Sequence, residues 1–245
     1  MSHVRFRYLL LPAALLPILS GIPQCSPTGN GDELVEFTFN FAEGPQNWIS
    51  LFTNYHVGDE EWVEIESDYR SLPAPLDTAR KALFITGHNH PDDLNMYFKR
   101  RLGGLQPNLT YRIEFEVEFA TNVPAGCAGI GGPPGEGVTV HADASRYEPE
   151  QVVDESVPPP YYRLNLVTDS SDQWYENTKL GDITNSRSSE DEWVFELKTL
   201  KGDPSYPMVR TDQEGRLWVI VGTRSGFEGI TSLYYAKIVI TLRRE

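Results

Sequence analysis

A segment near the middle of the chain alternates strictly between apolar and charged residues. From Tyr111 to Phe119 every odd-numbered residue is aromatic or aliphatic, and the even-numbered residues are Arg112 and three glutamates. Successive side chains of a β-strand point to opposite faces, so this period of two places all the apolar groups on one face. A helix would spread the glutamates around its circumference. The segment therefore predicts a half-buried strand that covers an apolar core on one side.

The same alternation recurs from residue 34 onwards, and no helical period is sustained. This pattern predicts an all-β chain, folded as a two-sheet antiparallel β-sandwich (a jelly roll) of about ten strands. The predicted strands span 35–41, 62–66, 81–86, 94–102, 111–119, 137–141, 161–167, 193–200, 217–222 and 233–242.

The glycine- and proline-containing segment 103–110 favours a turn between two of these strands. We therefore expect 94–102 and 111–119 to pair antiparallel. Lys99 and Arg101 would then lie opposite the glutamates of the second strand, where each pair of opposite charges contributes about 0.2 to 1 kcal/mol.

The N-terminal residues are typical of an export signal. Arg5 and Arg7 precede an apolar run, 9–19, which is shorter than the about 20 residues that a transmembrane helix needs. We predict a signal at 1–21, a flexible tether at 22–33 and a single β-sandwich domain at 34–245. A long polar loop at 144–160, with prolines at 158–160, cannot join a central strand. The protein is thus predicted to be exported and then secreted, periplasmic or held in the cell envelope, with no transmembrane span.

Two cysteines allow at most one disulfide, so the fold must rest on its core. Cys25 is a candidate for lipidation and hence for a lipid tether, although Ile22 stands where a lipoprotein motif would place cysteine. The formal net charge of −14 repels nucleic acid, which is therefore excluded as a partner.

The residues Gly104-Leu105-Gln106-Pro107-Asn108-Leu109-Thr110-Tyr111 resemble the start of a strand that is common in carbohydrate-binding modules and galactose-binding-like jelly rolls, among them secreted bacterial proteins of unassigned function. The early Phe37-Thr38-Phe39 strand followed by Trp48, and the closing strand 233–240, fit the same order. The resemblance implies a jelly roll that often holds a structural calcium and exposes aromatic rings that stack on sugars.

Loop aromatics are the better candidates for ligand contact, because aromatic residues in strands are committed to packing. Trp174 and Tyr175 stand together in a segment rich in Asp, Ser, Gln and Asn. We predict that Trp174, Tyr175, Tyr161 and Phe227 contact carbohydrate. Asp169, Asp172 and Asp182 supply oxygen ligands in the same region and form a candidate calcium site.

His88 and His90 form an H-x-H pair, which can present two imidazoles to one metal ion. Cupins are jelly rolls with such a pair, a later glutamate and a distant third histidine, a part that His141 could play. No glutamate follows the pair at the cupin spacing. The three histidines are therefore an alternative metal site.

These features favour an exported, non-enzymatic β-sandwich that binds carbohydrate or glycan-like surface material, with calcium as its one candidate cofactor. Two alternatives stay open. The first is a metal-dependent jelly-roll enzyme of cupin or polysaccharide-lyase type, and the second is a structural or adhesive envelope protein.

Overall fold

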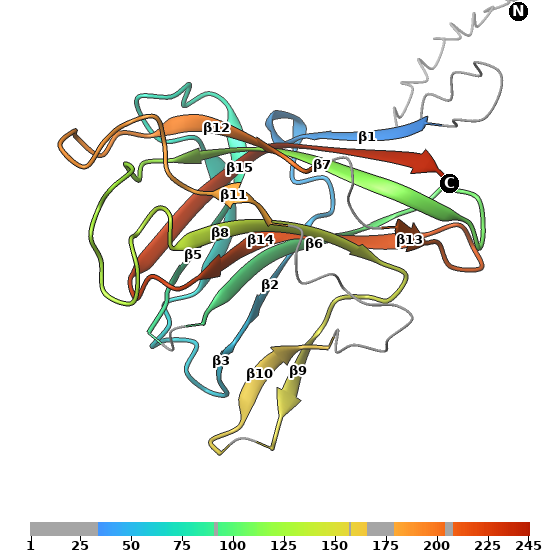
Figure 1. The fold of residues 1–245 in the computed structure, drawn as a ribbon, viewed down its shortest axis with the longest axis horizontal. Helices are drawn as coiled ribbons and strands as arrows, with labels where there is room; N and C mark the ends of the chain where they lie inside the picture. Colours follow the sequence, from blue (N-terminus) through green and yellow to red (C-terminus); the bar gives the residue numbers. More distant parts are fainter. Residues whose placement is uncertain (1–33, 91–92, 157, 166–178, 204–207) are drawn as a thin grey trace, which may run out of the picture.

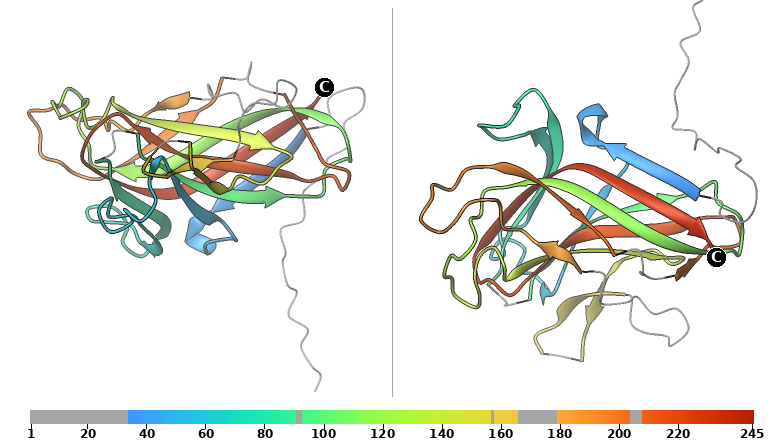
Figure 2. Two further views of the ribbon diagram at one scale, coloured as in Figure 1. Left: turned by 90° about the horizontal axis from the view of Figure 1, so that it is seen from below. Right: turned by 45° about the horizontal axis from the view of Figure 1, so that its top comes forward.

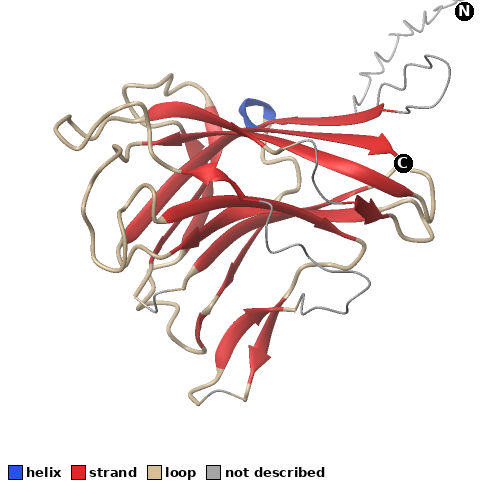
Figure 3. Ribbon diagram, viewed as in Figure 1, coloured by secondary structure: helices blue, strands red, loops and turns tan. Residues whose placement is uncertain are grey.

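The structure is a computed structural model, and it describes residues 34–90, 93–156, 158–165, 179–203 and 208–245. These residues form fifteen strands and one short 3₁₀ helix, η1 (Phe41–Glu43) (Figures 1 and 3). The predicted antiparallel sandwich is confirmed, since every strand pair in the described residues is antiparallel. The predicted number of strands is too low. Several of the additional strands span two to four residues, which is too short to show an alternation.

Two large sheets make the layers of the sandwich. Sheet A has the order β12-β7-β15-β5-β4, with β1 also paired to β15 and β13 to β7, and sheet B has the order β11-β8-β14-β6-β2. Sheet A consists of β1 (Leu34–Asn40), β4 (Glu66–Ser71), β5 (Lys81–His88), β7 (Thr110–Thr121), β12 (Glu196–Lys201), β13 (Met208–Arg210) and β15 (Ile230–Arg244). Sheet B consists of β2 (Ile49–Thr53), β6 (Asn95–Leu102), β8 (Val138–Ser145), β11 (Lys179–Asp182) and β14 (Leu217–Ser225).

The core lies between sheets A and B. The odd-numbered residues from Tyr111 to Phe119 of β7 are all buried in it, and the glutamates between them lie on the outer face, as predicted. Sheet B contributes Phe98, Val219 and Val221, among others, from the facing side. Each fully buried side chain of this size stabilises the fold by about 1.5 to 3 kcal/mol relative to exposure. Among the described residues, no helix is long and apolar enough to cross a membrane.

The predicted pairing of 94–102 with 111–119 is wrong, because the two strands belong to different sheets. β6 pairs with β14 and β2 in sheet B, whereas β7 pairs with β15, β12 and β13 in sheet A. The link between them crosses from one layer to the other, and its Leu105 is buried with its amide bonded to the carbonyl of Gly215. No hairpin closes there.

The glutamates of β7 therefore find other cations. Lys201 Nζ lies 2.5 Å from Glu116, and Arg80 lies 3.3 Å from Glu118. Lys99, which we expected opposite these glutamates, points away from the core on sheet B. These ion pairs on the outer face of sheet A are partly exposed, so each contributes at most about 1 kcal/mol.

A third, smaller sheet lies against sheet B. It has the order β3-β10-β9, with β3 (Tyr55–His56), β9 (Gln151–Asp154) and β10 (Tyr161–Leu164). Figures 1 and 2 show the β9–β10 hairpin set off from the two main layers. We call this hairpin the flap. Leu164 of the flap packs on Leu51, Tyr97 and Ile220, so the flap contacts the outer face of sheet B. The segment 144–160, which we expected to be a long polar loop, contains the end of β8 and all of β9.

Gly222 of β14 generates a test of this packing. A Cβ at this position would lie 2.1 Å from the carbonyl oxygen of Met96 and 2.4 Å from the ring of Tyr97, on the neighbouring strand. We predict that Gly222→Ala lowers the free energy of unfolding by about 2 kcal/mol or more, because the ring and the strand must move.

The matched control is Gly103→Ala, where the new Cβ would meet only Arg216 Cγ at 3.6 Å. Its free energy of unfolding should change by less than about 1 kcal/mol. Urea unfolding of both variants measures the difference, and equal stabilities would contradict the packing of Tyr97 over Gly222.

Candidate functional site

The outer face of sheet B carries polar and aromatic side chains in three rows. The central strand β14 is flanked by β6 and β8 in regular register, and alternate residues of all three point away from the core. We call these residues the sheet B face. Its rows are Tyr97–Gly222–His141, Lys99–Ile220–Asp143 and Arg101–Trp218–Ser145.

Several polar members of the sheet B face are buried. Lys99, His141, Asp143 and Ser145 are each less than one tenth exposed. The outer face of an antiparallel sandwich is ordinarily solvated, and charged side chains are almost never buried without partners. Burial of this kind on a non-core face is therefore informative, because it costs free energy that the fold alone does not require.

Lys99 is held by two hydrogen bonds. Its Nζ donates hydrogen bonds of 2.7 Å to Glu148 Oε1 and 2.7 Å to the carbonyl oxygen of Pro149, immediately before β9. The ammonium group therefore ties the base of the flap to the middle of sheet B. Charge-assisted hydrogen bonds of this length are among the stronger ones in proteins.

Tyr97, Arg224 and His141 form a second group beside Gly222. Arg224 Nε donates to the hydroxyl of Tyr97 at 3.2 Å. His141 Nε2 lies 2.8 Å from the hydroxyl of Thr139, whereas its Nδ1 is buried and has no hydrogen-bond partner. Burial, followed by the positive charges of Arg224 and Lys179, lowers the pKa of His141 to about 4. The imidazole is therefore neutral at neutral pH.

Trp218 brings an aromatic ring to the same face. The ring is half-buried, and the cationic groups of Lys99 and Arg101 lie 5.4 and 5.8 Å from its centroid. The exposed Tyr147 follows two residues after Ser145, which is the register partner of Trp218. The sheet B face thus combines aromatic rings with hydrogen-bonding groups held on rigid strands.

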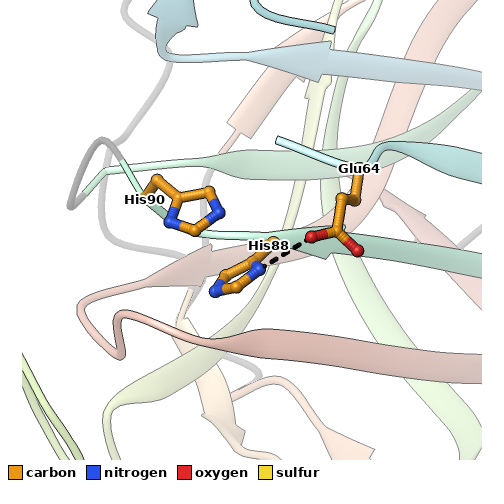
Figure 4. A group of neighbouring side chains, drawn as sticks. All are labelled: Glu64, His88 and His90. Atoms are coloured by element: carbon orange, nitrogen blue, oxygen red, sulfur yellow. Dashed lines mark hydrogen bonds and ion pairs between the residues drawn. The ribbon is translucent and has the colours of Figure 1, made fainter. Parts of the chain in front are cut away.

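A second cluster lies at the end of β5. His88 Nδ1 is 3.0 Å from Glu64 Oε1, and the rings of His88 and His90 stack with centroids 3.5 Å apart (Figure 4). Trp62 stacks on His90 at 4.5 Å with an interplanar angle of 15°. One ligand atom from each of Glu64, His88 and His90 lies within 4.8 Å of the other two. The cluster therefore has the donor set of a metal site.

The structure does not bring His141 to this cluster. His141 lies on β8 of sheet B, whereas His88 ends β5 of sheet A, so the three predicted histidines do not share one site. Glu64 takes the third place instead. It stands 24 residues before His88, and no spacing in the sequence connects the two.

The other predicted ligand residues are placed as follows. Tyr161 of β10 is buried, with the ring of His56 at 4.8 Å and Arg163 at 4.3 Å from its own ring. Phe227 packs against the core from the turn between β14 and β15. Trp174 and Tyr175 lie outside the described residues, as does Cys25.

The predicted calcium ligands are only partly described. Asp182 Oδ1 accepts hydrogen bonds from the amide and hydroxyl of Thr184, at 3.0 and 2.6 Å, and from Lys198 Nζ at 2.9 Å. Burial opposes ionisation of Asp182, but these hydrogen bonds outweigh it and lower its pKa. Asp169 and Asp172 lie outside the described residues. Calcium binding here stays a prediction.

Sequence reasoning missed Trp218 and Glu64. We assigned Trp218 to the interior of a strand and therefore to packing, and nothing in the sequence marked Glu64. In β14 the neighbours of Trp218, Leu217 and Val219, are buried in the core. The alternation therefore places Trp218 on the other face of the strand, and this signal could have shown it on the outer face of the sheet.

No protein-family model matches the chain, and no curated protein matches it. Solved structures do. TmCBM61, in complex with β-1,4-galactotriose, is 11% identical over 82% of this chain and 92% of its own, with a TM-score of 0.35. The K3 adhesin domain of Lys-gingipain from Porphyromonas gingivalis is 12% identical over 86% and 99%, with a TM-score of 0.37. A putative sugar-binding protein from Bacteroides thetaiotaomicron is 12% identical over 80% and 88%, with a TM-score of 0.34.

The chain also matches the enzymatically active domain of tailspike protein 4 from bacteriophage CBA120, but it spans 19% of that chain, at 12% identity and a TM-score of 0.33. Carbohydrate-binding modules are thus among the structures to which this chain is similar. These similarities assign neither a ligand nor an activity to it.

The low pKa of His141 predicts a pH dependence of stability. The unfolded histidine has a pKa of about 6.5, and the folded one has a pKa of about 4, so the unfolded chain binds one more proton between these values. The contribution of neutral His141 to the free energy of unfolding is therefore fully present above pH 6.5. It is lost as the pH is lowered towards 4, by up to about 1.4 kcal/mol per pH unit.

Urea unfolding of the wild-type chain and of His141→Asn at pH 7 and pH 5 measures this effect. On lowering the pH, the wild type should lose about 2 kcal/mol more than the variant. The histidines at 56, 88 and 90 are common to both proteins and cancel in the comparison. Parallel pH dependences would show that His141 is not buried in its neutral form.

Proposed function

We propose that this protein is an exported, non-enzymatic β-sandwich that binds carbohydrate through the sheet B face. The observation that carries the proposal is the combination on this face of an aromatic ring, Trp218, with buried and fixed hydrogen-bonding groups. Sugar rings offer an apolar face of C–H groups and a rim of hydroxyls, so they are recognised by this combination of surfaces.

Trp218 supplies the apolar surface in this proposal, and the hydroxyls of the sugar pair with polar groups of the neighbouring rows. Ser145 and Arg101 flank Trp218 directly across β8 and β6. His141 and Asp143 lie further along the same strand, β8, and are buried. Because these groups stand on strands, little conformational entropy is lost when a ligand binds.

Trp174 and Tyr175 lie outside the described residues, but the segments on either side of them are described. The last described residue before them, Asn165, donates from Nδ2 to the carbonyl of Glu148 at 2.9 Å, and the first after them, Lys179, is the register partner of His141. Both described ends of this segment lie beside the sheet B face. Contact of Trp174 and Tyr175 with carbohydrate remains part of the proposal.

Location outside the cytoplasm is the second part of the proposal. It rests on the charged and apolar pattern of residues 1–21 and on the tether at 22–33, with Cys25 as the proposed point of lipid attachment. Because residues 1–33 lie outside the described part of the chain, the support for export comes from the sequence.

A metal-dependent jelly-roll enzyme is the second candidate function. The observation in its favour is the Glu64, His88 and His90 cluster, which has the two imidazoles and one carboxylate found in many catalytic metal sites. Metal-dependent turnover of a polysaccharide, lost in His88→Ala and His90→Ala, would favour the enzyme over the binding module.

Binding of the chain to a glycan array, followed by calorimetry with the glycan that is found, tests the proposal. Trp218→Ala should weaken binding by about 1 to 3 kcal/mol, because the variant loses the apolar platform. Trp218→Phe should keep part of the affinity, since it keeps an aromatic ring.

The matched control is Trp193→Ala. Trp193 is exposed and lies just before β12, in sheet A, so its loss removes a tryptophan without touching the sheet B face. Its affinity should equal that of the wild type. Loss of binding in Trp193→Ala alone would place the ligand elsewhere, and a chain that binds no glycan of the array would contradict the proposal.

A further inference from the structure

We propose that Glu64, His88 and His90 bind a divalent transition metal ion, for which Zn²⁺ is the probe. This site is separate from the sheet B face and shares no residue with it. It differs from the metal site predicted from the sequence, because the third ligand is a carboxylate from the segment before β4 instead of His141.

The donor set fits the proposed metal. Zinc is bound by imidazole nitrogens and carboxylate oxygens at about 2.0 to 2.2 Å, which places tetrahedral ligand atoms about 3.5 Å apart. His88 Nδ1 and Glu64 Oε1 are 3.0 Å apart, and the widest separation in the cluster is within 4.8 Å. These separations lie on either side of the tetrahedral value, so binding of an ion requires rotation of the ligand side chains.

The backbone that carries the histidines is held by Asn89, which lies between them. Asn89 is 1% exposed; its Nδ2 donates to the carbonyls of Ser225 and Phe227, each at 2.9 Å, and its Oδ1 accepts from the amide of Leu94 at 2.8 Å. Its own amide donates to Gly229 at 3.1 Å. His88 at the end of β5 and His90 just after it therefore project from a fixed backbone, which lowers the cost of assembling a site.

The third ligand is tied to the same turn. The amide of His88 donates to the carbonyl of Val63 at 2.7 Å, and Val63, the residue before Glu64, is buried in the core. Glu64 itself has φ of 49°, a conformation that few residues other than glycine adopt. The carboxylate is thus directed at His88 by a backbone that is bonded to His88.

Trp62 completes the cluster. Its ring covers one face of His90, while His88 covers the other, so the His90 ring is held between two aromatic planes. The stack leaves the ring edges, where the nitrogens lie, free to face the carboxylate (Figure 4). Three protein ligands leave one position of a tetrahedral ion for water or for another ligand. A bound ion would also join the segment before β4 to the end of β5.

Calorimetric titration of the chain with Zn²⁺ tests this inference, using protein purified without a histidine tag and freed of metal with a chelator. The wild type should bind one ion with a dissociation constant below about 100 µM. His88→Ala and His90→Ala should each weaken binding by at least about tenfold, and Glu64→Gln should weaken it as well.

Two control variants keep the test specific. Glu61→Gln removes an exposed carboxylate three residues from Glu64, and His141→Ala removes a histidine of the sheet B face; both should bind Zn²⁺ like the wild type. Quenching of tryptophan fluorescence by Ni²⁺ is a second readout, which Trp62→Phe should reduce because the ring contacts a ligand. Circular dichroism establishes that each variant is folded.

A wild-type chain that binds no Zn²⁺ below about 100 µM would overturn the proposal. Unchanged affinity in folded His88→Ala and His90→Ala, or loss of binding in His141→Ala, would also overturn it. None of these results depends on glycan binding, so failure of this site and failure of the proposed function are separate outcomes.

Discussion

The antiparallel ladder between β7 and β15 is the interaction on which the rest of the structure depends. Ten residue pairs join the two strands, with one bulge between Tyr235 and Lys237. Their inward residues, from Tyr111 to Phe119 and from Leu233 to Leu242, are buried against sheet B. β1, β5, β12 and β13 all pair with one of these two strands. Loss of this ladder would leave sheet A without a centre and the core without one of its walls.

Because the apolar faces of both sheets are used in the core, the outer faces are left for other roles. The outer face of sheet A carries glutamates paired with Arg80 and Lys201, which contribute little to stability. It also carries an apolar cluster of Leu72, Ala82 and Ala120 with Phe195 and Tyr234. Sheet B is different. It buries Lys99, His141 and Asp143, and the burial of such groups carries a desolvation cost that ion pairs and hydrogen bonds only offset. The contrast between the two outer faces is the physical reason for placing ligand binding on sheet B.

The two proposed sites use different parts of the scaffold. The sheet B face is built from the middle of three neighbouring strands, where the positions of side chains are set by the register of the ladder. The Glu64, His88 and His90 cluster lies where β5 ends, and depends on the buried Asn89 and on the hydrogen bond from His88 to Val63. Strand pairing therefore fixes the geometry of the sheet B face, and the buried side chain of Asn89 fixes that of the Glu64, His88 and His90 cluster.

The local sequence determined the long strands and the class of the fold. A period of two is a property of neighbouring residues, so β7 could be predicted with its inward and outward faces, and β5, β6, β14 and β15 could be predicted as strands. The sequence by itself also placed His88 and His90 on one extended segment. It could not show the short strands, because two to four residues hold too little alternation.

Only the tertiary structure decided how these segments meet. It placed β6 and β7 in different sheets, although they follow each other in the chain, because pairing depends on which partners cover both apolar faces at once. It placed Glu64 beside His88 and His90, and Glu148 beside Lys99. It also placed His141 in sheet B, away from the histidine pair. Such contacts join residues far apart in the sequence, and no local periodicity records them. The local sequence pattern thus determines the strands, and the long-range packing of those strands determines the sites.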